Sequence, residues 1–319
     1  MFDALLSNKK MKEQLTAAVK ADMPMHAYLF CGAAGSGKKT AAELLAYEII
    51  GASREKVLRG CHPDVVTIHP LEGKKLISVD QIREMRADAF VRPNEGRRKI
   101  YIIDGVHLMN DAGQNALLTV LEQPPSFAVF ILLSESRQKV LPTVISRCAV
   151  YDMEYVEPSC AAEYLKTVYP NKDLEQLKTA VRAAGGNIGL AKSFLGSEEF
   201  EKYSADCEKL VVSAMSSGEY TASRIISGMS KDELCGFLPV LAIYLRDLAV
   251  YSAMGNIDDA VFCDSILKNK QLFDKINLNL MYDSIRACES AIGLINANIS
   301  PALAAAKVVI LLCGGKNID

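Results

Sequence analysis

The sequence lacks an excess of charge of either sign. It contains 36 lysine and arginine residues against 38 aspartate and glutamate residues, which gives a net charge of −2 at pH 7. The chain as a whole is therefore not a polycation, and any contact with nucleic acid must come from a local basic patch or from a partner. Low-complexity tracts are absent, half of the 319 residues are hydrophobic, and the length suffices for two or three domains.

Long hydrophobic runs are absent as well. The longest apolar stretch, Ala302 to Cys313, contains Lys307 and is too short to span a bilayer. The first residues have no basic segment followed by an apolar one, so we expect no signal peptide. Nine cysteines are scattered along the chain, mostly in apolar contexts, which indicates reduced, packed thiols. These features predict a cytoplasmic protein without a membrane segment.

Metal-binding spacing is also missing. No pair of cysteines has the spacing of a zinc site, and the neighbours Cys61 and His62 have no further ligand at metal spacing. We therefore expect no zinc. A basic turn at residues 92–99 carries three arginines and a lysine, and it is more simply a solvated loop than a contact for a DNA backbone.

A glycine-rich loop is the first strong positive signal. The apolar residues 28–31 precede it as a short strand, and strong helix formers at residues 41–46 follow it. A strand, a GxxxxGK loop and a helix in this order favour phosphate binding, because the loop N–H groups and the helix N-terminus surround the anion. A tight turn with a chance lysine is the simpler alternative. The candidate binding residues are Gly32, Gly35, Gly37, Lys38, Lys39 and Thr40.

The metal part of this site is incomplete. Lys39 follows the loop lysine, where a serine or threonine hydroxyl would bind Mg²⁺, and Thr40 comes one position late. Asp104 ends an apolar strand, as the Mg²⁺-holding acid of P-loop ATPases does. The pattern predicts a phosphate cradle with a damaged metal site.

The residue that would orient the attacking water is missing too. P-loop ATPases of this kind carry a glutamate after the strand acid, and Gly105 stands there instead. We therefore expect little or no hydrolysis. Another acid, such as Glu122 or Glu135, could replace the glutamate only with a special geometry.

Arg147 lies between a helical turn and the last predicted strand. Its planar guanidinium could stabilise charge on the γ-phosphate of a neighbouring subunit, as arginine fingers do in trans. A structural ion pair is the more ordinary role for such an arginine, and the residues alone favour it.

Five apolar strands alternate with helices over the first half of the chain, which predicts a parallel sheet covered on both faces. Ligands bind at the carboxyl ends of such strands, where the glycine loop, Asp104 and Ser134 should gather. Residues 8–20 indicate a helix capped by Asn8, and residues 51–62 a polar turn. A helix that begins at Ser78 or Asp80 should place three apolar residues on one face, namely Ile82, Met85 and Phe90.

No strand signal follows residue 156. A helix over residues 200–215 is expected to end at Gly218, and Ser230 with Glu233 forms a capping box for a long helix. The final helix, Leu303 to Leu312, is apolar nearly all round and should be buried on more than one side. Packing within the chain and packing against another subunit both explain it.

Taken together, these residues resemble the AAA+ subunits of bacterial clamp loaders, most closely the delta-prime type. The resemblance covers essentially the whole chain and is specific in combination. Its motifs are His26-Ala27-Tyr28-Leu29-Phe30, His62-Pro63-Asp64, Asn115-Ala116-Leu117-Leu118, Leu121-Glu122-Gln123-Pro124-Pro125 and Ser146-Arg147-Cys148.

The resemblance implies an α/β fold with three parts. These are a P-loop AAA+ core with a parallel sheet at residues 1–156, a small helical lid at 157–195 and an all-α collar at 196–319. It favours Arg147 as a finger for a neighbour's ATP. Two further features depart from the family pattern: only Cys61 remains of a four-cysteine zinc module that relatives often carry near residues 50–62, and Gly189 stands where active relatives carry an ATP-sensing arginine.

The losses at Lys39, Gly105 and Gly189 indicate that ATP hydrolysis is lost, and the resemblance then implies a structural subunit of DNA polymerase III. By resemblance, its partners are the delta and gamma/tau subunits, with the sliding clamp and primed DNA reached through the complex. No cofactor would be required, although weak or vestigial binding of ATP, ADP or phosphate fits the loop. The alternatives are an active motor ATPase of the gamma/tau type and a stand-alone nucleotide-sensing protein.

Overall fold

The computed structural model describes residues 1–2, 5–51, 54–196, 199–216, 219–255, 260–273, 276–296 and 299–314. They form two compact units. The first comprises Met1–Ala161 together with Asn187–Leu190, and the second comprises Ala162–Gly186 and the chain from Ala191 onward.

A five-stranded parallel sheet forms the centre of the first unit. Its strand order is β2-β3-β4-β1-β5, so that β1 lies between β4 and β5. Because every strand runs in the same direction, the carboxyl ends of all five meet at one edge. The strands are β1 (Ala27–Cys31), β2 (Val65–Ile68), β3 (Lys99–Asp104), β4 (Ala128–Ser134) and β5 (Ala149–Asp152). The predicted parallel sheet is confirmed.

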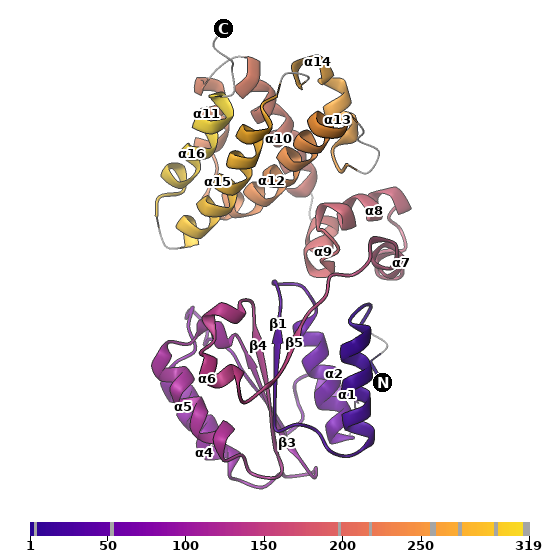
Figure 1. Ribbon diagram of the computed structural model, residues 1–319, viewed down its shortest axis with the longest axis vertical. Helices are drawn as coiled ribbons and strands as arrows, with labels where there is room; N and C mark the ends of the chain where they lie inside the picture. The colour runs from indigo at the N-terminus through magenta and orange to yellow at the C-terminus, as the bar shows by residue number, and fades with distance from the viewer. Residues whose placement is uncertain are drawn as a thin grey trace. The chain divides into compact units, whose positions relative to one another are not determined.

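Helices cover both faces of this sheet (Figure 1). On β1, Tyr28 and Phe30 pack among residues of α1 and α2, whereas Leu29 and Cys31 pack among residues of α4 and α5. The alternation follows from the two-residue period of a strand. The helical segments of the core are α1 (Lys9–Lys20), α2 (Lys38–Ile50), α3 (Arg54–Leu58), α4 (Val79–Ala89), η1 (Val106–Leu108), α5 (Asp111–Glu122), η2 (Arg137–Lys139) and α6 (Pro142–Ile145).

Three local predictions for the core were wrong. The expected polar turn at residues 51–62 contains the short helix α3. Phe90 does not share the buried face of α4, because it lies at the C-cap and its side chain is 59% exposed. Asn8 has the N-cap position of α1, but its backbone is left-handed with φ 65° and no side-chain cap forms. Its Oδ1 instead accepts the Glu154 N–H at 2.8 Å.

The described residues after Asp152 contain helices and no strand. Ser230 and Glu233 form the expected capping box at the start of α12, while the expected helix end at Gly218 lies outside the described residues. The helices are α7 (Pro158–Val168), α8 (Leu174–Ala183), α9 (Ile188–Gly196), α10 (Glu199–Ser216), α11 (Glu219–Ser227), α12 (Lys231–Met254), α13 (Cys263–Lys268), α14 (Lys270–Phe273), α15 (Leu278–Asn296) and α16 (Pro301–Cys313). The α/β class with a helical second half is confirmed.

Helix α12 forms the core of the second unit. Among the described residues it is the one helix long and apolar enough to cross a membrane by length and composition, yet 61% of its apolar window is buried inside the protein. It packs against α10 and α15. This burial is that of a core helix, and α12 gives no sign of a membrane protein.

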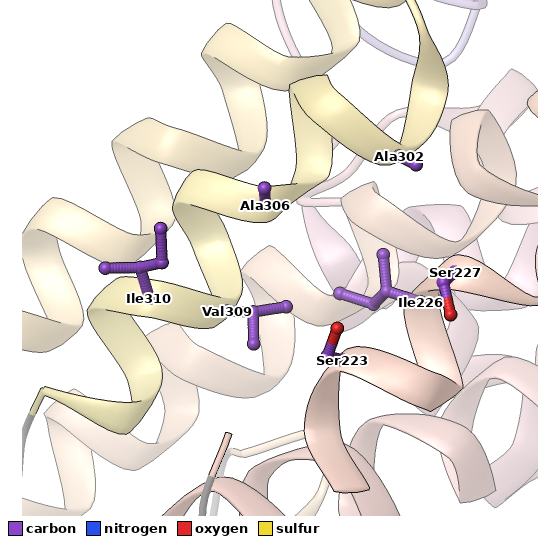
Figure 2. Close-up of a pocket in the computed structure, with 7 residues that line it drawn as sticks. All are labelled: Ser223, Ile226, Ser227, Ala302, Ala306, Val309 and Ile310. Carbon is purple, nitrogen blue, oxygen red and sulfur yellow. The ribbon is translucent and has the colours of Figure 1, made fainter. Parts of the chain in front are cut away.

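Helix α16 buries one side only within this chain. Ala304, Ala305 and Val308 lie in the core, but Leu303 is 69% exposed and Ile310 is 60% exposed. The expectation that α16 is buried on more than one side is therefore not met by this chain alone. A pocket of ≈ 230 Å³ lies between α16 and α11 (Figure 2). It is lined by Ser223, Ile226, Ser227, Ala302, Ala306, Val309 and Ile310.

Candidate functional site

The glycine-rich loop lies at the carboxyl edge of the sheet, where β1 ends. The Gly32 N–H donates to the Ser134 carbonyl at 3.1 Å, which ties the loop to the end of β4. Gly35 and Gly37 have φ values of 78° and 90°, in the left-handed region that favours glycine. Asp104 ends β3 at the same edge. The structure thus brings the loop, Asp104 and Ser134 together.

Lys38 is directed into its own loop. Its side chain is largely buried, and Nζ donates to the Gly32 carbonyl at 2.7 Å and to the Ala33 carbonyl at 2.8 Å. Burial lowers the pKa of Lys38, and the negative charges of Glu135 and Asp104 act in the opposite direction. The Lys38 ammonium group therefore bonds to carbonyls of its own loop and not to a phosphate that the loop could bind.

Glu135, named above as a possible substitute acid, forms a polar pair beside this site with His107, which the sequence did not single out. The Glu135 N–H donates to His107 Nδ1 at 3.2 Å. Burial lowers the pKa of His107, so that the imidazole is neutral at pH 7. Nδ1 then accepts, Nε2 carries the proton, and Nε2 lies 3.8 Å from the Glu135 carboxylate. The sequence feature that could have identified this pair was the histidine three residues after Asp104.

The position for a metal-binding hydroxyl carries an exposed ammonium group. Lys39 and Thr40 are both exposed. Burial raises the pKa of Glu43, and the charge of Lys39, four residues earlier on α2, lowers it. Lys39 therefore interacts with a carboxylate of its own helix, and a cation there repels a second cation such as Mg²⁺.

The segment 187–190 lies directly on the glycine-rich loop. Asn187 Nδ2 donates to the Ala34 carbonyl at 2.7 Å, and the Gly189 N–H donates to the Gly35 carbonyl at 3.0 Å. Asn187 Oδ1 also accepts the Leu190 N–H at 3.0 Å, which caps the first turn of α9. Asn187 therefore joins the start of α9 to the loop.

Gly35 and Gly189 approach so closely that neither position has room for a side chain. A Cβ at Gly189 would lie 2.4 Å from the Gly35 Cα, and a Cβ at Gly35 would lie 2.9 Å from the Gly189 Cα. An arginine at position 189 is incompatible with this contact. The family resemblance identified Gly189 as the position of a lost arginine, but the sequence held no signal that this glycine contacts the loop.

Arg147 lies at the opposite, amino edge of the sheet, two residues before β5. Its Nη2 lies 2.6 Å from Glu122 Oε1, and its Nη1 donates to the Thr143 carbonyl at 2.7 Å. The side chain is 34% exposed. Within this chain Arg147 is thus an ion-pair partner. Because Glu122 ends α5 at this edge, it cannot serve as the acid for the glycine-rich loop of its own chain.

The basic turn at residues 92–99 is held in place by Asp64. The Asp64 carboxylate accepts the N–H groups of Asn94, Glu95 and Gly96 at 2.5 to 2.8 Å. Burial alone would raise the pKa of Asp64, but these three donors hold it below its usual range. Two of the basic residues are engaged within the chain: Lys99 is buried against Asp88, and Arg98 contacts Asp22.

Cys61 and His62 have different surroundings. Cys61 is exposed, while His62 is buried and its Nδ1 accepts the Asp64 N–H at 3.1 Å. Across the described ranges, no group of three His, Cys, Asp or Glu residues is arranged to hold a metal ion. The absence of zinc stays a prediction.

Comparison with known proteins finds delta-type subunits of bacterial DNA polymerase III. The family model described as "DNA polymerase III, delta subunit" matches residues 7–157. The chain is 32% identical over 174 residues to DNA polymerase III subunit delta' of Pseudomonas aeruginosa, covering 51% of this chain and 53% of that one. It is 27% identical over 248 residues to the delta' subunit of Escherichia coli, covering 74% and 73%.

The motor-type subunits match as well. The gamma/tau subunit of Mycobacterium tuberculosis is 29% identical over 201 residues, covering 58% of this chain. The chain spans only 35% of the length of that relative. A gamma subunit-related protein of Thermotoga maritima superposes with a TM-score of 0.53 at 17% identity, covering 95% of this chain and all of that one. This likeness shows the fold.

Proposed function

The chain is a relative of the clamp-loader subunits of bacterial DNA polymerase III, and on that premise we propose that it is a non-hydrolysing structural subunit of the delta-prime type. It helps to load the sliding clamp on primed DNA in the cytoplasm. Residues 1–156 act as the AAA+ core, 157–195 as the lid and 196–319 as the collar. Its direct partners are delta and gamma/tau subunits, and it reaches the clamp and DNA through them.

The observation that carries this proposal is that the carbonyl groups of the glycine-rich loop bond to other groups of the same chain. All four carbonyls of residues 32–35 accept hydrogen bonds from this chain: two from Lys38, one from Asn187 and one from the Gly189 N–H. The residues fit Mg·ATP poorly, because Lys38 must leave two carbonyls to reach a phosphate and Lys39 replaces the residue whose hydroxyl would bind the metal. Weak binding of phosphate, ADP or ATP remains compatible with the loop, and no cofactor is required.

Arg147 supports the second half of the proposal, a finger supplied in trans. It lies at the edge of the sheet opposite its own glycine-rich loop, so a nucleotide within its reach would belong to a neighbouring subunit. A guanidinium presents a planar fork of donors that suits a phosphate. Arg147 is the catalytic residue of the proposal, and it acts on the partner's ATP.

An active motor ATPase of the gamma/tau type is the second candidate. The similarity to gamma/tau subunits favours it, as does the presence of two carboxylates, Asp104 and Glu135, near Lys38. This alternative requires Lys38 to leave its loop carbonyls and Glu135 to orient a water.

Steady-state ATP turnover separates the two candidates. We expect the purified chain to show no turnover above buffer, and to co-purify with delta and gamma/tau subunits into a complex that does turn over ATP. Turnover by the chain alone, lost on Lys38→Ala, would establish the motor assignment instead.

A further inference from the structure

Both terminal nitrogens of Arg147 are engaged within the chain. Nη2 pairs with Glu122 Oε1 at 2.6 Å, and Nη1 donates to the Thr143 carbonyl at 2.7 Å. The Ser146 hydroxyl lies 3.4 Å from Nη1 as a further acceptor. A bidentate contact with a phosphate uses two guanidinium nitrogens. Arg147 therefore cannot use both terminal nitrogens on a phosphate while it keeps these partners.

The backbone around Arg147 is anchored without Glu122. Gln114 of α5 is buried, its Nε2 donates to the Lys139 carbonyl at 3.0 Å, and its Oε1 accepts the Leu141 N–H at 2.8 Å. Val144 of α6 is fully buried in the same core as Leu117 of α5. Packing and Gln114 thus fix α6, and the Glu122 carboxylate acts on the guanidinium alone.

The Glu122–Arg147 pair is open to solvent. The two side chains are 48% and 34% exposed. Ion pairs at this exposure are weak, because water competes with each partner. The pair can therefore be opened by a stronger anion, and a phosphate group with more than one negative charge is such an anion.

We propose that Glu122 is a positioning residue that holds Arg147 on its own subunit and competes with the neighbour's nucleotide for the guanidinium. The finger is released from Glu122 only when the triphosphate of an adjacent subunit offers a more highly charged acceptor. This inference rests on the proposed role of Arg147 in trans. It adds a carboxylate that sets how readily the finger engages.

The test uses the complete complex and a non-hydrolysable ATP analogue. Glu122→Gln keeps the size of the side chain and removes its charge. We expect the Kd of the complex for the analogue to fall about threefold, consistent with the weakness of exposed ion pairs, and the ATPase kcat not to fall. The matched control is Glu55→Gln, which removes the same charge from a pair of equal length, formed at 2.6 Å by Glu55 of α3 and Arg59, the residue after this helix. This control should leave the Kd within twofold of the wild type.

A double variant ties the effect to Arg147. In an Arg147→Ala background, Glu122→Gln should no longer change the Kd. If Glu122→Gln raises the Kd or matches Glu55→Gln, Glu122 does not compete with nucleotide and the inference fails, while the finger itself stands. If Arg147→Ala changes neither Kd nor ATPase rate, the proposed function has failed instead.

Discussion

At the scale of single residues, the Gly35–Gly189 contact leaves no room for a side chain and gives the first prediction. A methyl group at position 189 would collide with the Gly35 backbone at 2.4 Å, and overpacking of this kind costs about 1–3 kcal/mol. Gly189→Ala should lower the free energy of unfolding by this amount in urea titration. The matched control is Gly293→Ala on α15, where a Cβ meets nothing within 4 Å and the change should stabilise by ~0.4–1 kcal/mol. Equal effects of the two variants would contradict the contact.

Asp64 gives a second prediction at this scale. Its carboxylate accepts three backbone N–H groups, and losing such bonds at a buried site costs about 1–3 kcal/mol. Asp64→Asn should be less stable than the wild type by this amount at pH 7. Asp80→Asn, an exposed change in the first turn of α4, serves as the control.

The pH dependence of the Asp64 contribution follows from its lowered pKa. The folded protein holds the proton less tightly than the unfolded chain, so the stabilisation is complete above the ordinary aspartate pKa of about 4. It is lost as the pH falls through the lower pKa of the folded state. The difference between wild type and Asp64→Asn should therefore shrink below about pH 4. A difference that stays constant down to pH 2 would contradict the assignment.

The candidate site could be predicted from the sequence only in part. Local spacing located Lys38 on the loop and Asp104 at a strand end, because both depend on neighbours in the chain. The contacts of Lys38 with its own loop, of Gly189 with Gly35 and of Arg147 with Glu122 had no such signal. The last two contacts depend on the fold, which brings together residues 154 and 25 positions apart in the chain.

At the scale of elements, β1 was predicted to within one residue and β3 with its last residue, because continuous apolar runs identify buried parallel strands. Helix α3 was missed because its five residues have too little apolar periodicity. Helices α11 and α13–α15 were not predicted individually, since hydrophobic residues throughout this half obscure where one helix ends.

Helix α16 carries the prediction at this scale. Its exposed stripe of Leu303, Lys307 and Ile310 borders the pocket against α11, and we propose that a neighbouring subunit covers it. Ile310→Asp should leave the chain folded, because the side chain is 60% exposed, and should abolish co-elution with partner subunits in size-exclusion chromatography. Leu174→Asp, an equally radical change at an exposed leucine of α8, should not. A complex that still forms with Ile310→Asp would rule out this contact.

At the scale of the whole molecule, the sheet unit and the helical half each have their own core. Removing residues from about 197 onward should therefore leave a folded core that no longer assembles with partners. Circular dichroism of the truncated chain checks the fold, and size-exclusion chromatography with the partners checks assembly. If the truncated chain enters the full complex, the subunit contacts lie in the core.

The central claim is that Arg147 of this chain contacts a neighbouring subunit's ATP, whereas the chain itself does not hydrolyse ATP. The most direct measurement is the ATP turnover of the complex reconstituted with Arg147→Ala and, separately, Arg147→Lys. Arginine fingers contribute roughly 10³–10⁵ in rate where measured in GTPases. We predict that both variants fold and join the complex, and that both lower its turnover and clamp loading, since lysine lacks the planar fork. Turnover and loading equal to those of the wild-type complex would contradict the account.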